Sequence, residues 1–316
     1  MMAVLPVRSK SSFTFLPGIS LFGHISGKQE FTTQGPANGP VDSPAGLQFN
    51  LSMDKNEREL AFLRDLYITD DFTRRFTELA DKHLKLKDAE NVLYLNAGTG
   101  THCFAVREAA GDDVAVFATC ENDELLKIAK DKAVALSSDV DVSAMSYESD
   151  AFDAVIADGS LTSPAEIGEL IAEAARVVRP GGKVTVMLPA AGSFGEIFSL
   201  LWEVMLDEEL VGDGISIEDL ISELPSASSL SEVAEATGLT KVSINTENEI
   251  FEYEDGAAFA ASPLVVDFLM PRWLGPMADK KKEQVMERLA QLIDAEDGDL
   301  AFRFTVKATI ITGEKA

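Results

Sequence analysis

Between residues 92 and 188, short apolar runs alternate with stretches of helical period, and this alternation restricts the possible folds more than any other feature of the sequence. Strands that alternate with helices form a parallel sheet that is covered on both faces. Because right-handed crossovers bring the carboxyl ends of parallel strands to one edge, we expect a ligand to bind at that edge. The predicted strands are residues 92–95, 114–118, 140–144, 152–157 and 183–188.

The net charge restricts the partners of the chain. With 27 Lys and Arg against 53 Asp and Glu, the formal charge is −26, in a composition that is 46% hydrophobic. A surface this acidic repels phosphate, so we expect neither nucleic acid nor an anionic membrane as a partner. Two cysteines and three histidines, without the spacing of zinc ligands, predict no metal site and a reducing, cytoplasmic location.

Residues 1–50 differ in composition from the rest of the chain. They carry three basic and two acidic residues, together with five prolines and six glycines, and show no helical or strand period. This composition predicts a disordered leader. The alternative is an organelle transit peptide, because the first 29 residues contain no acid and several serines.

The rest of the chain divides into four predicted parts. Residues 51–88 are expected to form two amphipathic helices, separated by a break at Thr69-Asp70-Asp71. Residues 89–190 form the core of the fold, residues 191–299 a helical lid with a sixth strand, and residues 300–316 the last strand. The apolar stripe of the first helix is predicted to contain Leu60, Leu63, Leu66 and Tyr67, and that of the second Phe72, Phe76, Leu79, Ala80 and His83.

The most informative chemical feature is the turn that follows the first strand. Gly98 and Gly100 permit positive φ and a close approach of a ligand to the backbone, and the next helix offers free N–H groups. A dinucleotide fingerprint would need a third glycine at position 103, where this chain has Cys103. The sequence therefore disfavours a nicotinamide or flavin site, and a plain turn without a ligand is the other reading.

Four segments together resemble the class I S-adenosylmethionine-dependent methyltransferases, of the small-molecule, methyltransferase type 11-like kind. Their order and spacing match that family over about residues 90–190. The resemblance implies an α/β fold, a doubly wound Rossmann-like, mostly parallel seven-stranded sheet with an antiparallel last strand, helices on both faces and a helical lid. The segments are VLYLNAGTG (92–100), ENDELLKIAKDKA after the second strand, DVSAMSYESDAFDAVIADGSL (141–161) and ARVVRPGGKVTVMLP (175–189).

The resemblance also implies S-adenosylmethionine as cofactor. The family holds the ribose with an acid at the end of the second strand, where this chain has Cys120 followed by Glu121, and it commonly opens the glycine turn with an acid, where this chain has Asn96. Asp141 and the backbone of Val142 match the positions that hold adenine. The implied cofactor-binding residues are Asn96, Ala97, Gly98, Gly100, Cys120, Glu121, Asp141, Val142 and Asp158.

The implied activity is methyl transfer to a small-molecule acceptor. A general base is needed only for an acceptor that is protonated in its ground state, and Asp158, Glu203 or a tyrosine could then serve. Large apolar residues around Phe194 and in 263–273 form either the core of the lid or an apolar acceptor pocket without a polar anchor. The alternatives are a catalytically degenerate, methyltransferase-like binding or interaction protein and, less favoured, a nucleotide-dependent oxidoreductase.

Overall fold

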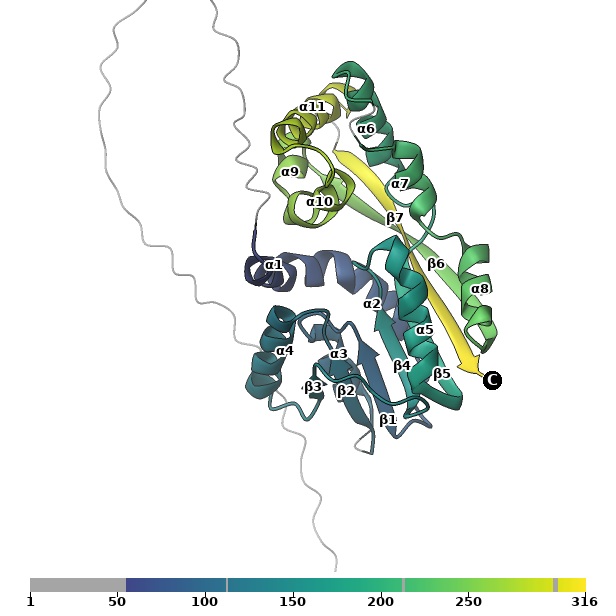
Figure 1. Ribbon diagram of the computed structural model, residues 1–316. Helices are drawn as coiled ribbons and strands as arrows, with labels where there is room; N and C mark the ends of the chain where they lie inside the picture. Colours follow the sequence, from purple (N-terminus) through teal and green to yellow (C-terminus); the bar gives the residue numbers. More distant parts are fainter. Residues whose placement is uncertain (1–54, 112, 212–213, 298–300) are drawn as a thin grey trace, which may run out of the picture. The chain divides into compact units, whose positions relative to one another are not determined.

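A seven-stranded sheet with the order β3-β2-β1-β4-β5-β7-β6 forms the centre of the fold (Figure 1). The structure, a computed structural model, describes residues 55–111, 113–211, 214–297 and 301–316, so the predicted leader lies outside the described residues. Strands β1 to β5 pair in parallel, and β7 is antiparallel to both β5 and β6. The strands are β1 Asn91–Leu95, β2 Ala115–Thr119, β3 Asp141–Ser143, β4 Phe152–Asp158, β5 Val178–Pro189, β6 Leu239–Tyr253 and β7 Phe302–Lys315. The predicted mostly parallel sheet with an antiparallel last strand is confirmed.

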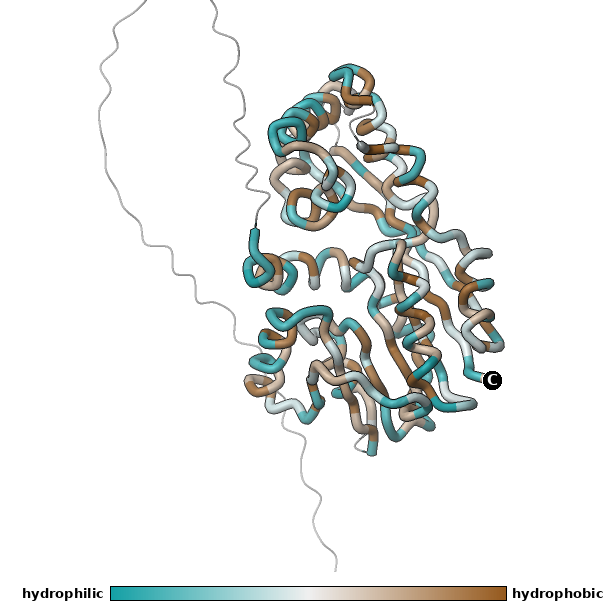
Figure 2. Tube along the Cα trace, viewed as in Figure 1, coloured by the Kyte–Doolittle hydropathy of each residue, from teal (hydrophilic) through white to brown (hydrophobic). Residues whose placement is uncertain are grey.

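Alternate residues of the strands pack against helices on opposite faces, as expected for a sheet that is buried on both sides. Val92 and Tyr94 pack with residues of α2 (Arg74–Asp81), α3 (Thr101–Ala109) and α4 (Asp123–Leu136). Leu93 and Leu95 pack instead with residues of α5 (Ile167–Val177) and α8 (Ala227–Ala236). Figure 2 shows hydrophobic stretches along the central strands between these helices.

The leading helix differs from its prediction. Helices α1 (Glu57–Leu63), η1 (Arg64–Thr73) and α2 follow one another without a gap, and the predicted break at residues 69–71 lies inside η1, which is a π-helix. The predicted stripe of the first half was wrong at Leu66 and Tyr67, which are 65% and 52% exposed, whereas Leu60 and Leu63 are half-buried. Its buried residues are Ala61, Arg64 and Ile68, whereas Phe72, Phe76, Leu79 and Ala80 of the second half are buried as predicted.

Helix α5 ends at Val177, three residues before the Pro180-Gly181-Gly182 turn. The pairing of β5 with β4 shifts register there, between Val178 opposite Phe152 and Lys183 opposite Ala154. Gly181 has a φ of +76° and open space around it, so it is needed for its backbone conformation alone, whereas a Cβ on Gly182 would lie 2.8 Å from the carbonyl oxygen of Asp153.

The remaining helices lie between β5 and β7 in the chain, except the short η2, which precedes α5. We use "lid" for α6, α7, α9, η3, α10 and α11, whose buried residues join the same core cluster as α2 and α3. None of the described helices has the length and hydrophobicity needed to cross a bilayer. The bounds are α6 Gly195–Asp207, α7 Ile217–Glu223, α9 Gly256–Ala261, η3 Leu264–Leu269, α10 Met270–Trp273 and α11 Asp279–Asp297, with a short 3-10 helix η2 at Pro164–Glu166.

Candidate functional site

The turn after β1 has the conformation that its glycines permit. Asn96, Gly98 and Gly100 all have left-handed backbones, with φ of 55°, 58° and 86°. The Ala97 N–H donates to the carbonyl of Thr119 at 2.7 Å, which holds the turn against the end of β2. A Cβ on Gly98 would lie 2.9 Å from a guanidinium nitrogen of Arg64. Gly98 is therefore required both for its φ and for a close approach, which in this structure is made by an arginine.

The side chain of Glu121 contacts the glycine turn, whereas that of Cys120 makes no hydrogen bond with it. The Glu121 carboxylate accepts the Gly98 N–H at 3.1 Å, and its other oxygen lies 2.5 Å from Nη1 of Arg64. Asn122 accepts the N–H of Leu125 and so caps α4, which fixes the direction in which the chain leaves β2. Burial raises the pKa of the Cys120 thiol to about 12, so the thiol is protonated at neutral pH.

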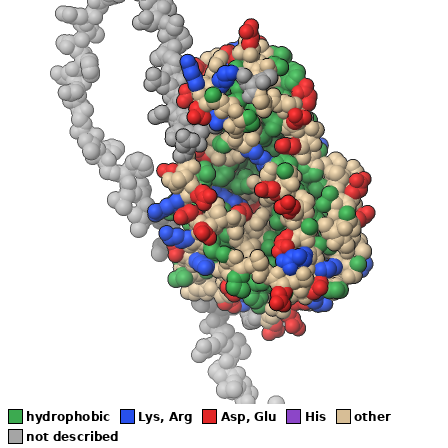
Figure 3. Space-filling view, in the orientation of Figure 1, with side chains coloured by type: hydrophobic (Ala, Val, Ile, Leu, Met, Phe, Trp, Pro, Cys, Tyr) green, Lys and Arg blue, Asp and Glu red, His purple; other side chains and the backbone are tan. Residues whose placement is uncertain are grey.

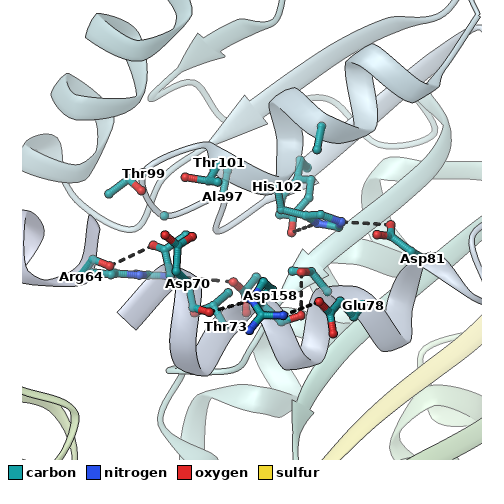
Figure 4. A pocket seen from close by; sticks show the side chains of 16 residues that line it. Arg64, Asp70, Thr73, Glu78, Asp81, Ala97, Thr99, Thr101, His102 and Asp158 are labelled. Carbon is teal, nitrogen blue, oxygen red and sulfur yellow. Dashed lines mark hydrogen bonds and ion pairs between the residues drawn. The ribbon is translucent and has the colours of Figure 1, made fainter. Parts of the chain in front are cut away.

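Arg64 comes from η1 and connects the acids at this edge of the sheet. Its side chain is 8% exposed, and Nη2 lies 3.9 Å from Oδ2 of Asp158 (Figure 4). Burial opposes the charge of Arg64, but Glu121 and Asp158 outweigh it and raise the pKa of the guanidinium. Burial also raises the pKa of Asp158, against the lowering effects of Arg64 and of Ser160, whose backbone N–H donates to the carboxylate at 2.8 Å.

Two cavities meet at Arg64. The first holds about 270 Å³ and is lined by residues that include Thr73, Tyr94, Gly98 and Asp158. The second holds about 540 Å³, and its lining residues include Asn96, Glu121, Asn122, Leu125 and Leu161. Because Arg64 lines both, its side chain forms a wall between them. We call the two together the cofactor cleft.

A hydrogen-bonded chain crosses the first cavity. The Tyr94 hydroxyl lies 2.8 Å from Nδ1 of His102, and Nε2 of His102 lies 3.1 Å from Asp81 (Figure 4). Burial raises the pKa of Tyr94 well above its usual value. The chain gives the buried Tyr94 hydroxyl a partner, and His102 is half-buried between β1 and α2.

The structure brings together most of the predicted site residues. Asn96, Ala97, Gly98, Glu121 and Asp158 all line the cofactor cleft, whereas Gly100 packs against Phe104 behind it. Among the described residues, no group of His, Cys, Asp and Glu could hold a metal ion.

Three other predicted residues lie away from the cleft. Val142 is buried in β3, opposite Ala118 of β2. Asp141 begins β3 opposite Phe117, is exposed and lines neither cavity, so its adenine contact stays a prediction. Glu203 is exposed on α6 and lines neither cavity.

Arg64 was missed by the sequence reading. The sequence pointed to Arg64 only through its spacing: it comes three residues after Ala61 and four before Ile68, on the helical face that is buried in the structure. An arginine on a buried helical face needs acidic partners. The sequence does not reveal that Glu121, after β2, and Asp158, at the end of β4, are these partners.

Comparison with known proteins identifies the central part of the chain. Residues 93–186 match a family model described as a methyltransferase domain. No relative is found among the curated proteins. Among solved structures, the YcgJ protein of Bacillus subtilis has a TM-score of 0.50 and 15% identity, with coverage of 77% of this chain and 98% of that one. At this identity the likeness shows the fold.

Two further solved structures are similar at lower scores. A putative methyltransferase from Bacillus halodurans has a TM-score of 0.49 and 13% identity, over 77% of this chain and 99% of that one. Phosphoethanolamine N-methyltransferase 2 of Haemonchus contortus, solved with S-adenosyl-L-methionine, has a TM-score of 0.48 and 12% identity, over 82% of this chain and 57% of that one.

Proposed function

We propose that this chain, whose residues 93–186 match a methyltransferase domain, transfers a methyl group from S-adenosylmethionine to a small-molecule acceptor. The observation that carries the proposal is the position of Glu121. Its carboxylate lies beside the glycine turn at the carboxyl edge of the sheet, in the larger of the two cavities. A carboxylate can accept hydrogen bonds from two adjacent hydroxyls, as ribose presents them.

The residues of the cleft fit the cofactor. Gly98 and its neighbours form a cradle that a Cβ would fill, and Glu121 supplies the acid that the family has one residue earlier, at the position of Cys120. Asn96 at the start of the turn can donate and accept hydrogen bonds. When bound, S-adenosylmethionine supplies an electrophilic methyl group on a sulfonium. The protein then has to align the acceptor and exclude water.

Arg64 has to release Glu121 before the carboxylate can bind ribose. The Arg64 guanidinium occupies one Glu121 oxygen and the approach to Gly98. Asp158 is the second acid within reach of Arg64, so the guanidinium can keep a partner when it leaves Glu121. We propose that Arg64 and the ribose compete for Glu121.

A calorimetric titration with S-adenosylhomocysteine tests the proposal. We expect a dissociation constant in the micromolar range, and NADH, titrated as the control, should give no heat. A protein that binds neither S-adenosylmethionine nor S-adenosylhomocysteine would contradict the assignment. Methyl uptake from labelled cofactor in the presence of small-molecule extracts then identifies the acceptor.

A further inference from the structure

A third cavity lies beneath the lid and adjoins the cofactor cleft. It is lined by five aromatic side chains, and it shares Leu161 and Phe268 with the larger cavity of the cleft. Ser160, two residues after Asp158, also lines it. Figure 3 shows hydrophobic side chains gathered in the hollow between the lid helices and the core. The aromatic residues are Phe72, Phe194, Phe198, Phe268 and Trp273.

The backbone around this cavity is irregular in three places. Phe72 belongs to the π-helix η1, and Phe268 and Leu269 belong to the second π-helix of the described chain, η3. Phe194 has a left-handed backbone, with a φ of 63°, which is costly for a bulky residue. π-Helical turns and strained backbones concentrate at functional sites. Their meeting at one cavity therefore supports a ligand-binding role.

Arg272 supplies the polar group that the apolar sequence pattern lacked. It lines the cavity from α10, next to Trp273, and it makes no hydrogen bond or ion pair with any described residue. Burial lowers the pKa of its guanidinium, while Glu223 and Glu166 raise it only partly. Glu223 lines the same cavity but is exposed, so water screens its charge. A half-buried guanidinium that has lost part of its water, with only these two acids to compensate it, is stabilised by an anion.

We propose that this cavity binds the methyl acceptor and that the acceptor is a ring-bearing carboxylate whose carboxyl group binds Arg272. The proposal rests on the methyl-transfer function proposed above. The planar guanidinium matches the two oxygens of a carboxylate, and the aromatic walls match a ring. The shared Leu161 and Phe268 put the ligand next to the cofactor cleft.

The size of the cavity indicates that the lid moves when the ligand enters. The cavity holds about 50 Å³, whereas a cavity of about 150 Å³ admits benzene. A ring therefore displaces lid side chains, and Trp273 is one of them. The chain has two tryptophans, and Trp202 is 41% exposed and outside the cavity. The Trp202→Phe variant thus leaves Trp273 as the only tryptophan that reports on binding.

Fluorescence titrations of the full-length Trp202→Phe protein with benzoate and with benzamide test the proposal. The two probes share ring and size but differ in charge. We expect benzoate to bind at least tenfold more tightly, and we expect Arg272→Gln to abolish this preference. Arg272→Lys keeps the charge without the two-pronged geometry, and should retain a preference of a few-fold. The matched control is Arg303→Gln, which removes an exposed arginine of β7 and should leave the preference unchanged.

Equal binding of the two probes, or a preference that survives Arg272→Gln, would overturn the proposal. The same samples are titrated with S-adenosylhomocysteine, which separates the two hypotheses. Cofactor binding without a benzoate preference overturns the carboxylate pocket alone. A benzoate preference without cofactor binding supports the pocket and contradicts methyl transfer.

Discussion

The cofactor cleft contains a buried arginine and the cavity beneath the lid a half-buried one, and the two are in opposite electrostatic situations. Arg64 has Glu121 at 2.5 Å and Asp158 at 3.9 Å, and these acids raise its pKa. Arg272 has no ion pair with a described residue, and burial lowers its pKa. The first charge is already compensated within the protein. The second is compensated only in part, by Glu223 and Glu166.

The comparison teaches what each arginine contributes to stability. Removing one member of a buried ion pair leaves the other charge uncompensated, which costs about 3 kcal/mol or more. Replacing an unpaired buried charge with an apolar side chain removes a desolvation cost. The two arginines should therefore respond differently to the same substitution.

The largest expected effect is on folding stability. Arg64→Met should lower the free energy of unfolding by about 3 kcal/mol, whereas Arg272→Met should leave it within about 1 kcal/mol or raise it. Urea denaturation at pH 7 measures both. The opposite order would mean that Arg272 is the arginine with the better partner.

The next effect concerns the acid that pairs with Arg64. Glu121→Ala should weaken S-adenosylhomocysteine binding about 100-fold, since two charge-assisted hydrogen bonds are lost. Cys120→Ala, one residue earlier, should change it by about twofold or less, because a thiol is a poor acceptor. Isothermal calorimetry measures both affinities. If Cys120→Ala caused the greater loss, the ribose contact would belong to Cys120.

Gly98, which Arg64 approaches, can be compared with Gly181 by making the same substitution at both positions. Gly98→Ala and Gly181→Ala both place a side chain at positive φ, so each should cost about 1 kcal/mol of stability. Only Gly98 has Arg64 at 2.9 Å from the added Cβ, whereas Gly181 has open space. We expect affinity for S-adenosylhomocysteine to fall about tenfold for Gly98→Ala and to stay unchanged for Gly181→Ala. Equal losses of affinity would show that Gly98 does not face the ligand.

Competition between Arg64 and ribose predicts a smaller gain. In Arg64→Met, Glu121 is free, so 5′-methylthioadenosine, which lacks the carboxylate of the cofactor, should bind about fivefold more tightly, or ~1 kcal/mol. Arg303→Met is the control, because Arg303 is on β7 with 64% of its side chain exposed and lines neither cavity of the cleft. A loss of affinity in Arg64→Met would show that Arg64 helps to bind the nucleoside.

The smallest effect is a pH dependence at the two thiols, one of which is next to Glu121. Burial raises the pKa of both Cys103 and Cys120 to about 12, and for Cys120 this outweighs the lowering by Arg64. The folded state therefore keeps protons that the unfolded state releases above about pH 9. The stabilisation is complete below pH 9 and is lost as the pH rises toward 12.

At pH 9.5 the loss should be somewhat under 1 kcal/mol for each thiol. Urea denaturation of the wild type and of the double Cys→Ala variant at pH 8 and pH 9.5 measures it. The wild type should lose more stability between these two values. An identical pH dependence of the two proteins would contradict the raised thiol pKa values.

The sheet could be predicted from the sequence because each strand is a short apolar run with a turn after it. The strand ends fixed Glu121 and Asp158 at one edge, and the structure brings them to the same cleft. Arg64 could not be predicted, because its partner Glu121 is 57 positions away in the chain. In addition, the polar residues 69–71 suggested the end of a helix where the helix in fact continues. The unbroken π-helix there changes which residues are buried.

The continuous leading helix touches both regions. Arg64 of η1 lines the cofactor cleft, and Phe72 of the same π-helix lines the cavity beneath the lid. A ligand that shifts this helix at one end therefore alters binding at the other. Such coupling is reciprocal, so the factor by which cofactor strengthens acceptor binding equals the factor by which acceptor strengthens cofactor binding. Measuring either affinity with and without the other ligand therefore gives the size of this coupling.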